Sequence, residues 1–332
     1  MSVATSLELI RLQGQLKSGL GMVQDTIRSA LGTDSSSPAF EYVDYLLKSQ
    51  GKLMRPILAL LVDQCFSGSS SPHPEVVQFA AAIELIHMAS LVHDDIIDDA
   101  QTRRNKATIY AHFGVGSAVA LGVYLYAVSL RLLSQIGSIP IISQLSDAVQ
   151  SMCEGELVQL SARRQLTDSY ASYLKMIESK TADLFAVTCF GVATIHQQRP
   201  EMIDQARLMG TQLGMLFQLT DDYLDFFDES GTLKKEGGQD IRQSQVTLPI
   251  WQLMTHLSPE QKEELWELIR LADLTGVQHV MAPYETQVQG QCQGVCETHL
   301  NAYMNAAKSL SQAHSDTRLK IVGDLVFSRA FS

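Results

Sequence analysis

The sequence has too few cysteines, too widely scattered, for a disulfide framework or a zinc site. It contains 5 cysteines in 332 residues, and no two of them have the CxxC spacing that zinc ligands favour. An odd, scattered set of cysteines is typical of a reducing compartment, where thiols mainly fill space in the core. We therefore expect a soluble, cytoplasmic protein without disulfides.

Basic residues are also fewer than acidic residues. The chain has 25 lysines and arginines against 36 aspartates and glutamates, which gives a formal net charge of -11. Because nucleic-acid-binding proteins usually present a net basic face, nucleic acid is not an expected partner. Local basic clusters can still bind a small phosphorylated molecule.

The sequence lacks a clear targeting or membrane-spanning segment. Residues 1–16 show no basic stretch followed by an apolar run, so no secretory signal is expected. The stretch 113–130 has no charge and reaches the lower length limit of a spanning helix, but it includes glycines, serines and tyrosines. We interpret it as a helix buried in a large helical core, with a membrane span as the alternative.

Alternating strand patterns are scarce, and helical periodicity extends over most of the chain. Apolar residues recur at three and four positions in 75–99, 145–162, 170–195 and 207–227. Clusters of Ser, Gly and Pro interrupt this pattern at 32–38, 67–74, 137–140 and 231–238. Since none of these breaks resembles an interdomain linker, the sequence predicts one all-α domain over residues 1–332.

Two acidic clusters share one spacing, DDxxD, and each follows an apolar run. The clusters are Asp94, Asp95 and Asp98, and Asp221, Asp222 and Asp225. On a helix, residues four apart lie on one face, and crowded carboxylates repel unless a cation neutralises them. Magnesium binds through one or two carboxylates and fills its other positions with water and phosphate oxygens. A single acidic cluster usually marks a solvated helix face, but two matching clusters favour a site that holds a diphosphate through magnesium ions.

Several cations accompany these clusters. They are Lys52 and Arg55 in GKLMRP, Arg103 and Arg104 after the first cluster, and Lys180 in KTADLF. Arginine forks and lysine point charges are the usual partners of a diphosphate. Each residue alone would be read as a surface charge, and only their combination with both acidic clusters indicates a diphosphate site.

Taken together, these motifs resemble the all-trans isoprenyl (polyprenyl) diphosphate synthase family, long-chain type. The resemblance runs through GKLMRP, HMASLVHDDIIDDAQTRR, MCEGELVQL, KTADLF and GMLFQLTDDYLDFFD to GQDIRQSQVTLP. It implies a single large bundle of antiparallel helices around a deep central cavity, with the acidic clusters on opposing walls and a dimer as the usual assembly. Bundle cores often build metal sites in this way.

The resemblance also implies substrates and residue roles. The enzyme would join isopentenyl diphosphate to an allylic diphosphate such as geranyl or farnesyl diphosphate, with about three Mg²⁺ ions per site, and could deliver its product to a membrane. The allylic diphosphate would be held through the six aspartates and by Arg103, Lys180 and Lys235. Isopentenyl diphosphate would be held by Lys52, Arg55, His87 and Arg104. Thr181 and Gln218 would border the reacting carbons.

The expected reaction explains the need for so many charges. Departure of diphosphate from an allylic carbon develops negative charge on oxygen, which metal ions and fixed cations stabilise. The double bond of isopentenyl diphosphate then captures the carbon cation, and loss of a proton completes the extension. No side chain in the motifs is an evident base, so the released diphosphate is the expected proton acceptor.

Product length is expected to depend on residues one or more helical turns before Asp94. Ala89 and Ser90 are too small to block a growing chain, which by family resemblance favours a medium or long product. Ile86 and Ile83 are candidates for the floor of the tunnel. The alternative is that Ala89 and Ser90 simply allow close helix packing.

Two positions depart from the family pattern. Gln245 replaces a usual lysine in GQDIRQSQVTLP, and Val123 replaces a common aspartate in ALGVYLYA. These changes raise an alternative function, a weakly active or non-catalytic partner subunit of a heteromeric synthase. A terpene cyclase fits less well because its second cluster is normally not DDxxD. The two complete acidic clusters favour an active enzyme.

Overall fold

The computed structural model describes residues 10–12, 14–32, 37–48, 51–104, 106–162, 169–227, 237–310 and 318–331. The first half of the chain forms α2 (Lys17–Leu31), α3 (Phe40–Leu47), α4 (Met54–Ser67), α5 (Pro74–Ile97), β1 (Thr102–Arg103), β2 (Lys106–Ala107), α6 (Ile109–Phe113), α7 (Val115–Ile136) and α8 (Ile139–Ala162). The second half forms α9 (Tyr170–Ile177), the π-helical turn η1 (Glu178–Ala182), α10 (Asp183–Ile195), α11 (Pro200–Phe227), α12 (Gln239–Arg242), α13 (Leu248–Met254), α14 (Pro259–Arg270), α15 (Leu274–Met281), the 3-10 turn η2 (Ala282–Tyr284), α16 (Glu285–Leu310) and α17 (Arg318–Phe327).

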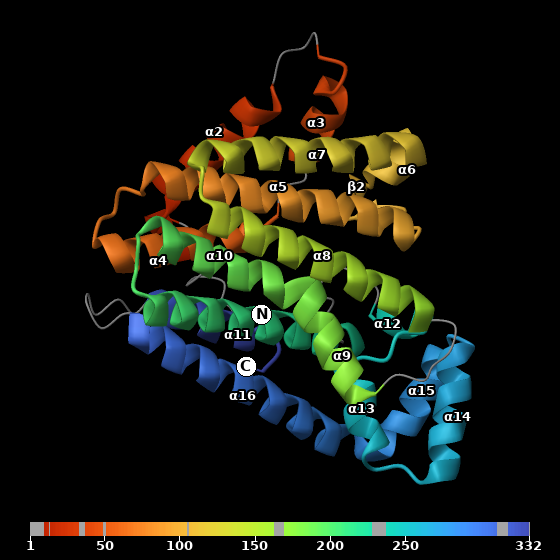
Figure 1. The fold of residues 1–332 in the computed structure, drawn as a ribbon. Helices are drawn as coiled ribbons and strands as arrows, with labels where there is room; N and C mark the ends of the chain where they lie inside the picture. The colour runs from red at the N-terminus through yellow and green to blue at the C-terminus, as the bar shows by residue number, and fades with distance from the viewer. Residues whose placement is uncertain are drawn as a thin grey trace.

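Long helices packed side by side make up the body of the molecule (Figure 1). Helix α5 lies along α7, α10 lies against α8 and α11, and α11 lies along α16. Within the described residues, the only sheet is the antiparallel β1–β2 hairpin. The all-α prediction is therefore confirmed.

Helix α5 shows why the sequence folds in this way. Pro74 occupies its first turn, where a missing N–H costs nothing, and His73 accepts the backbone N–H of Glu75 at 3.3 Å. Apolar residues cover almost every side of the helix from Val76 to Val92, and they are buried. A helix that is apolar all round belongs inside a helical core, and α5 contacts α2, α4, α7 and α10.

One continuous hydrophobic core joins these elements. Buried residues from α2 to α17 belong to the same cluster, including Leu20 near its beginning and Val326 near its end. Contacts of this kind normally define one domain. We propose on this basis that the chain forms a single domain, as the sequence predicts.

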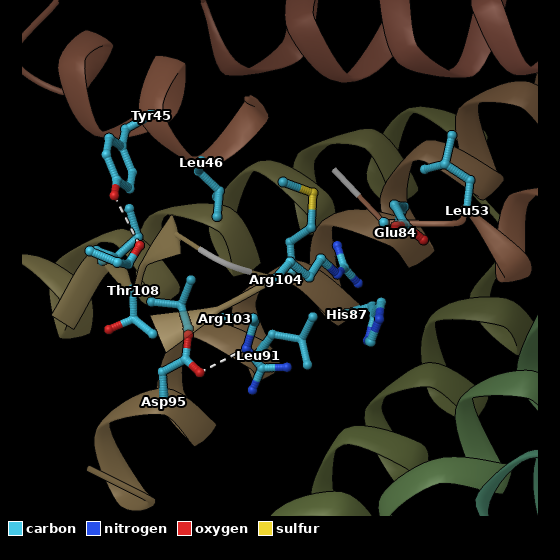
Figure 2. Close-up of a pocket in the computed structure, with 15 residues that line it drawn as sticks. Tyr45, Leu46, Leu53, Glu84, His87, Leu91, Asp95, Arg103, Arg104 and Thr108 are labelled. Carbon is cyan, nitrogen blue, oxygen red and sulfur yellow. Dashed lines mark hydrogen bonds and ion pairs between the residues drawn. The ribbon is translucent and has the colours of Figure 1, made fainter. Parts of the chain in front are cut away.

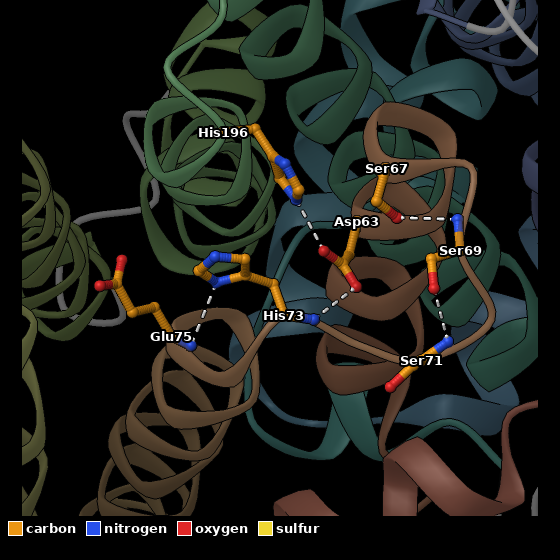
Figure 3. A network of polar contacts seen from close by, with 7 residues as sticks. All are labelled: Asp63, Ser67, Ser69, Ser71, His73, Glu75 and His196. Carbon is orange, nitrogen blue, oxygen red and sulfur yellow. Dashed lines mark hydrogen bonds and ion pairs between the residues drawn. The ribbon is translucent and has the colours of Figure 1, made fainter.

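A buried polar network fixes the end of the bundle where α5 begins and where α4 and α10 end (Figure 3). The carboxylate of Asp63, which is fully buried, accepts the backbone N–H of His73 at 3.1 Å. Its other oxygen lies 2.7 Å from Nε2 of His196. Asp63 thus joins α4 to the start of α5 and to the end of α10.

The prediction that residues 113–130 form a buried helix is correct for only one side of α7. Gly114, with φ of 84°, separates α6 from α7, and one side of α7 then packs on α5. The other side exposes Val115, Val119, Val123 and Leu130, and Val123 is 58% exposed. By length and hydropathy alone α5 and α7 could each cross a membrane, and 78% and 39% of their most apolar windows are buried in the protein.

Candidate active site

A cavity of about 380 Å³ opens among α4, α5, the β-hairpin, α8, η1, α10 and α11. Most of the residues predicted to form the site line this one cavity. They are Lys52, Arg55, His87, Ser90, Asp94, Asp98, Arg103, Arg104, Lys180, Thr181, Gln218 and Asp221. The predicted Lys235 lies outside the described residues.

The aspartates of the first cluster have different surroundings. Asp94 and Asp98 line the cavity at the end of α5. Asp95 is only 5% exposed, and its Oδ1 accepts a hydrogen bond from Nε of Arg103 at 2.8 Å. Burial raises the pKa of Asp94 to about 6, and the nearby charge of Lys180 opposes that rise. Asp94 and Asp98 therefore face the cavity, whereas Asp95 anchors the β-hairpin.

The second cluster divides in the same way. Asp221 lines the cavity and forms an ion pair with Arg329, which follows α17. Asp222 is 5% exposed, and burial raises its pKa to about 7 although two hydrogen-bond donors oppose the rise. Asp225 Oδ2 accepts the backbone N–H of Asp240 at 2.9 Å, at the start of α12. Of the three carboxylates, Asp221 is the one that lines the described cavity.

Cationic side chains gather on the α4 side of the cavity. Arg55 is 8% exposed, and its guanidinium lies 4.4 Å from the centre of the Phe185 ring. Burial lowers the pKa of Arg55 to about 10, and the charge of Glu84 opposes this. Within the described part of the chain, Arg55 Nε and Glu84 Oε2 are buried without a hydrogen-bond partner. Buried polar atoms of this kind call for a partner, and a bound anion would supply one for Arg55.

The β-hairpin brings two further arginines to the site (Figure 2). Arg103 pairs with Asp95, and Arg104, with φ of 53°, lies with His87 and Glu84 around an adjoining pocket of about 70 Å³. Burial and the surrounding arginines lower the pKa of His87 well below its usual value, so this imidazole is neutral and can still donate one N–H.

Gly51 leaves room for the Arg104 side chain. The guanidinium of Arg104 packs directly on it, and a Cβ at position 51 would lie only 2.7 Å from Nη2 of Arg104. Larger residues at this position would displace the arginine. This contact gives a physical reason for the first residue of the GKLMRP motif.

Lys180 enters the cavity from the π-helical turn η1. Such turns interrupt the regular helix ladder and often occur at functional sites. Its Nζ donates to Glu156 Oε2 at 2.5 Å and to Gln159 Oε1 at 3.0 Å. The motif MCEGELVQL on α8 therefore positions Lys180.

Thr181 and Gln218 are joined to the buried aspartate of the second cluster. The Thr181 hydroxyl donates to Gln218 Oε1 at 2.8 Å, and Gln218 Nε2 donates to Asp222 Oδ1 at 2.7 Å. Tyr173 donates its hydroxyl to Asp222 Oδ2 at 2.6 Å. The bonds from Gln218 and Tyr173 thus place both oxygens of Asp222 against protein donors.

Sequence reasoning missed five residues that shape the site. They are Glu84, Glu156, Gln159, Tyr173 and Arg329. Glu156 and Gln159 fall inside a recognised motif, and Tyr173 lies two helical turns before Lys180, so spacing could have indicated them. Arg329 comes from a segment distant in sequence, and its position depends on the tertiary fold.

The residues predicted to control product length occupy two faces of α5. Ser90 lines the cavity, and its hydroxyl donates to the His87 carbonyl at 2.9 Å. Ala89 and Ile83 are fully buried and Ile86 is 2% exposed, and none of the three lines the cavity described above. Their role in product length stays a prediction.

The face of α5 that contains Ala89 and Ile86 points toward α7. One turn before Ile86, the Ala82 carbonyl accepts the Ser129 hydroxyl of α7 at 3.0 Å. One turn after Ala89, His93 packs on Gly122 of α7. Because these residues recur at the helical repeat, they share one face. A larger side chain at position 89 would therefore press on α7, whereas one at position 90 would enter the cavity.

The carboxylates of this cavity suit a magnesium ion that is also bound by a substrate phosphate. They suit less well a metal ion bound by protein ligands alone. No three His, Cys, Asp or Glu side chains converge in the part of the chain that the structure describes. Asp94, Asp98 and Asp221 nevertheless supply hard oxygen ligands around one cavity. Magnesium in proteins commonly takes one or two carboxylates and completes its shell with substrate phosphate and water.

Gln245 and Val123, the two positions that differ from the family pattern, do not line the described cavity. Gln245 Nε2 donates to Gln243 Oε1 at 2.8 Å, and its backbone N–H donates to the Asp240 carbonyl at 2.8 Å. Gln245 thus closes the turn after α12. Val123 lies on the exposed side of α7.

Comparisons with known proteins agree with this geometry. The profile of the family described as Polyprenyl synthetase matches residues 38–286. The octaprenyl diphosphate synthase of Escherichia coli (strain K12) is 35% identical over 221 residues, which are 66% of this chain and 67% of that protein. The heptaprenyl diphosphate synthase component 2 of Geobacillus stearothermophilus is 34% identical over 245 residues, covering 74% and 75% of the two chains.

A solved structure extends the similarity to nearly the whole fold. The polyprenyl synthase of Caulobacter crescentus CB15, complexed with calcium and isoprenyl diphosphate, superimposes with a TM-score of 0.85 and 25% identity. The match covers 97% of this chain and 98% of that one. With its matching profile, relatives and fold, the chain is an enzyme of the polyprenyl synthetase family.

Proposed function

We propose that the protein joins isopentenyl diphosphate head-to-tail to an allylic diphosphate and releases an all-trans polyprenyl diphosphate of medium or long chain. The observation that carries the proposal is the placement of Asp94 and Asp98 on α5 and of Asp221 on α11 around one cavity that also holds a cluster of cations. The names of the relatives, octaprenyl and heptaprenyl diphosphate synthase, support the product class.

Isopentenyl diphosphate is assigned to the α4 side of the cavity. Arg55, Arg104 and Lys52 would neutralise its phosphates, and neutral His87 would donate a hydrogen bond. The unpartnered Nε of Arg55 supports this choice because a phosphate oxygen would satisfy it. Burial, the neighbouring charge of Arg329 and that of Arg104 lower the pKa of Lys52, as expected in a crowded cationic pocket.

The allylic diphosphate is assigned to the space between the acidic clusters. Asp94, Asp98 and Asp221 would hold about three Mg²⁺ ions jointly with the diphosphate oxygens, and Lys180 and Arg103 would add fixed positive charge. Bound magnesium would stabilise the charge that develops on the leaving diphosphate. Asp95, Asp222 and Asp225, also predicted as ligands, have their described contacts with protein donors, so a supporting role fits them better.

The reacting carbons would lie beside Thr181 and Gln218, which line the cavity. Oxygen dipoles there can stabilise an allylic cation, and the fixed substrates would make carbon–carbon bond formation effectively intramolecular. The released diphosphate is the proposed acceptor of the proton that leaves in the last step. Lys235 stays a proposed phosphate contact.

The second candidate function is a partner subunit of a heteromeric synthase. The name of one relative, heptaprenyl diphosphate synthase component 2, favours a role for a second chain. The exposed apolar side of α7, with Ile139, Leu157 and Val158 of α8, offers a surface for a second copy of this chain or for a different subunit. We propose the homodimer first because the cavity already contains both acidic clusters.

One assay separates the two functions. The purified chain is incubated with labelled isopentenyl diphosphate, Mg²⁺ and geranyl or farnesyl diphosphate, and the dephosphorylated products are separated by chromatography. An active homomeric enzyme gives a ladder ending in one long product. Absence of incorporation by the chain alone, with activity restored by a second protein, would identify the partner subunit.

A further inference from the structure

A chain of three hydrogen bonds leads from the cavity wall into the protein interior. Thr181 of η1 donates to Gln218 of α11, Gln218 donates to Asp222, and Tyr173 of α9 donates to Asp222 from the other side. Thr181 and Gln218 line the cavity. Tyr173 and Asp222 are only 4% and 5% exposed and do not line the cavity, and Gln218 connects them to its wall.

The direction of each bond is fixed by chemistry. Gln218 Nε2 and the Tyr173 hydroxyl each donate to one oxygen of Asp222, which leaves Gln218 Oε1 facing Thr181. Because that oxygen also only accepts, the Thr181 hydroxyl must donate to it. In this arrangement the amide protons of Gln218 point toward the buried Asp222, and its oxygen lies beside the hydroxyl of Thr181.

Burying Asp222 is costly, which indicates that it has a specific role. An apolar pair of similar volume usually stabilises a protein interior as well as or better than a buried charge. Tyr173 and Gln218 each donate a hydrogen bond to one oxygen of Asp222, at 2.6 and 2.7 Å, so the carboxylate is held in one orientation. Because Asp222 accepts at both oxygens, the NH₂ end of the Gln218 amide points toward it and the amide oxygen points toward Thr181.

We propose that Tyr173 and Asp222 are positioning residues that orient the Gln218 amide, so that Gln218 and Thr181 present oxygen to the allylic cation. This inference rests on the proposed function, since it requires a carbon cation in the cavity. In this proposal Asp222 orients Gln218 and does not bind magnesium, in contrast to Asp221.

The test uses ligands that need no turnover. One is an allylic diphosphate analogue in which a protonated amine nitrogen replaces the carbon that would become cationic, and the other is its neutral carbon isostere. Their dissociation constants are measured by calorimetry with Mg²⁺ present. The ratio of the two constants reports stabilisation of the positive charge, because the diphosphate and the chain are common to both ligands.

Tyr173→Phe removes only the hydroxyl and keeps the charge of Asp222. We expect the wild type to bind the cationic ligand at least about tenfold more tightly than the isostere, and Tyr173→Phe to reduce that ratio at least about fivefold. Tyr170→Phe is the matched control, since its ring lies beside Tyr173 with centroids 6.0 Å apart on the same helix. The control should keep the ratio within about twofold of the wild type.

A second variant covers the case in which Tyr173→Phe does not fold. In Asp222→Asn, Tyr173 still donates to the side-chain oxygen, so the new NH₂ group faces Gln218 and turns its amide around. The preference for the cationic ligand should be lost. Binding of Mg²⁺ with inorganic diphosphate should stay within about twofold of the wild type, whereas Asp221→Asn should weaken it strongly.

The possible results distinguish a failure of this inference from a failure of the proposed function. A folded Tyr173→Phe that keeps the full preference for the cationic ligand overturns the inference alone. Equal loss of Mg²⁺ and diphosphate binding in Asp222→Asn and Asp221→Asn also overturns it, because Asp222 would then be a metal ligand. A wild type that does not distinguish the two ligands contradicts the cation site of the proposed function, and the inference falls with it.

Discussion

Arg329 forms an ion pair with Asp221 of the second acidic cluster, and its guanidinium also lies 4.7 Å from the centre of the Phe217 ring. The segment after the last described helix thus places a positive charge beside a carboxylate that faces the cavity. The Arg329 side chain is 12% exposed, so the pair is screened less than a surface ion pair.

Arg329→Ala should destabilise the metal-free protein by about 1 to 2 kcal/mol, because Asp221 loses its counter-charge in a partly buried position. The free energy of unfolding is measured by urea titration in EDTA. Arg270→Ala is the control, since Arg270 pairs with Glu267 while both side chains are more than half exposed, and its effect should be below about 0.5 kcal/mol. Equal effects of the two substitutions would contradict the buried pairing.

The pKa of Asp94 predicts an unusual pH dependence. Burial raises this pKa from its ordinary value of 3.8 to about 6, so the folded protein binds the proton more tightly than the unfolded chain. The contribution of Asp94 to stability therefore becomes less favourable as pH rises from about 4 through about 6. Asp94→Asn should stabilise the metal-free protein at pH 8, by at most about 3 kcal/mol, and much less at pH 4.5.

The measurement is urea unfolding of the wild type and Asp94→Asn in EDTA at both pH values. Comparing each variant with the wild type at the same pH cancels the other titrating groups. A stability difference independent of pH would show that Asp94 has an ordinary pKa.

Ser90 gives a prediction about product length. Since Ser90 lines the cavity below Asp94, Ser90→Tyr should place a ring in the path of the growing chain and stop elongation at about fifteen to twenty carbons. Ala89→Phe should change product length much less, because position 89 faces α7 and does not line the cavity. Because Ala89 is fully buried, this second variant should also lose about 1 to 3 kcal/mol of stability.

Products are compared by chromatography after dephosphorylation, and Mg²⁺ dependence should be retained in both variants. An unchanged product distribution from a folded, active Ser90→Tyr would show that the chain does not pass this residue. The assignment of a long product would then have to be withdrawn.

Gln245 provides a test of the missing lysine. If the glutamine only weakens diphosphate binding, Gln245→Lys should lower the Michaelis constant for the allylic substrate, since one charge-assisted contact contributes about 1.5 to 3 kcal/mol. Gln243→Lys, two residues away in the same turn, is the matched control and should not change that constant. Equal kinetics of wild type and Gln245→Lys would indicate that this side chain does not reach the diphosphate.

The all-helical fold was accessible from sequence because apolar residues follow the helical repeat over long stretches such as Val76 to Val92. Most cavity residues were accessible for a related reason, since DDxxD places Asp94 and Asp98 on one face. What spacing cannot show is which neighbours each side chain meets. The contrast between Asp221, which faces the cavity, and Asp222, which is buried against Tyr173, depends on the packing of α9 on η1 and α11.

The exposed side of α7 was hidden from sequence for a similar reason. An uncharged stretch reads as buried, and Val123 cannot be told from a core residue by composition. Only the neighbours of α7 show that one side faces α5 and the other is open. Arg329 was hidden because its contact with Asp221 joins two segments far apart in the chain.

The most direct test of the central claim is the rate of labelled isopentenyl diphosphate incorporation by wild type, Asp94→Ala and Asp221→Ala over a range of Mg²⁺ concentrations. Both variants remove a carboxylate that faces the shared cavity, so turnover should fall by about two to four orders of magnitude while the fold persists. The wild type should be inactive in EDTA and should regain activity when Mg²⁺ is added. Near-normal turnover in either folded variant would contradict the assignment of this cavity as the site of diphosphate departure.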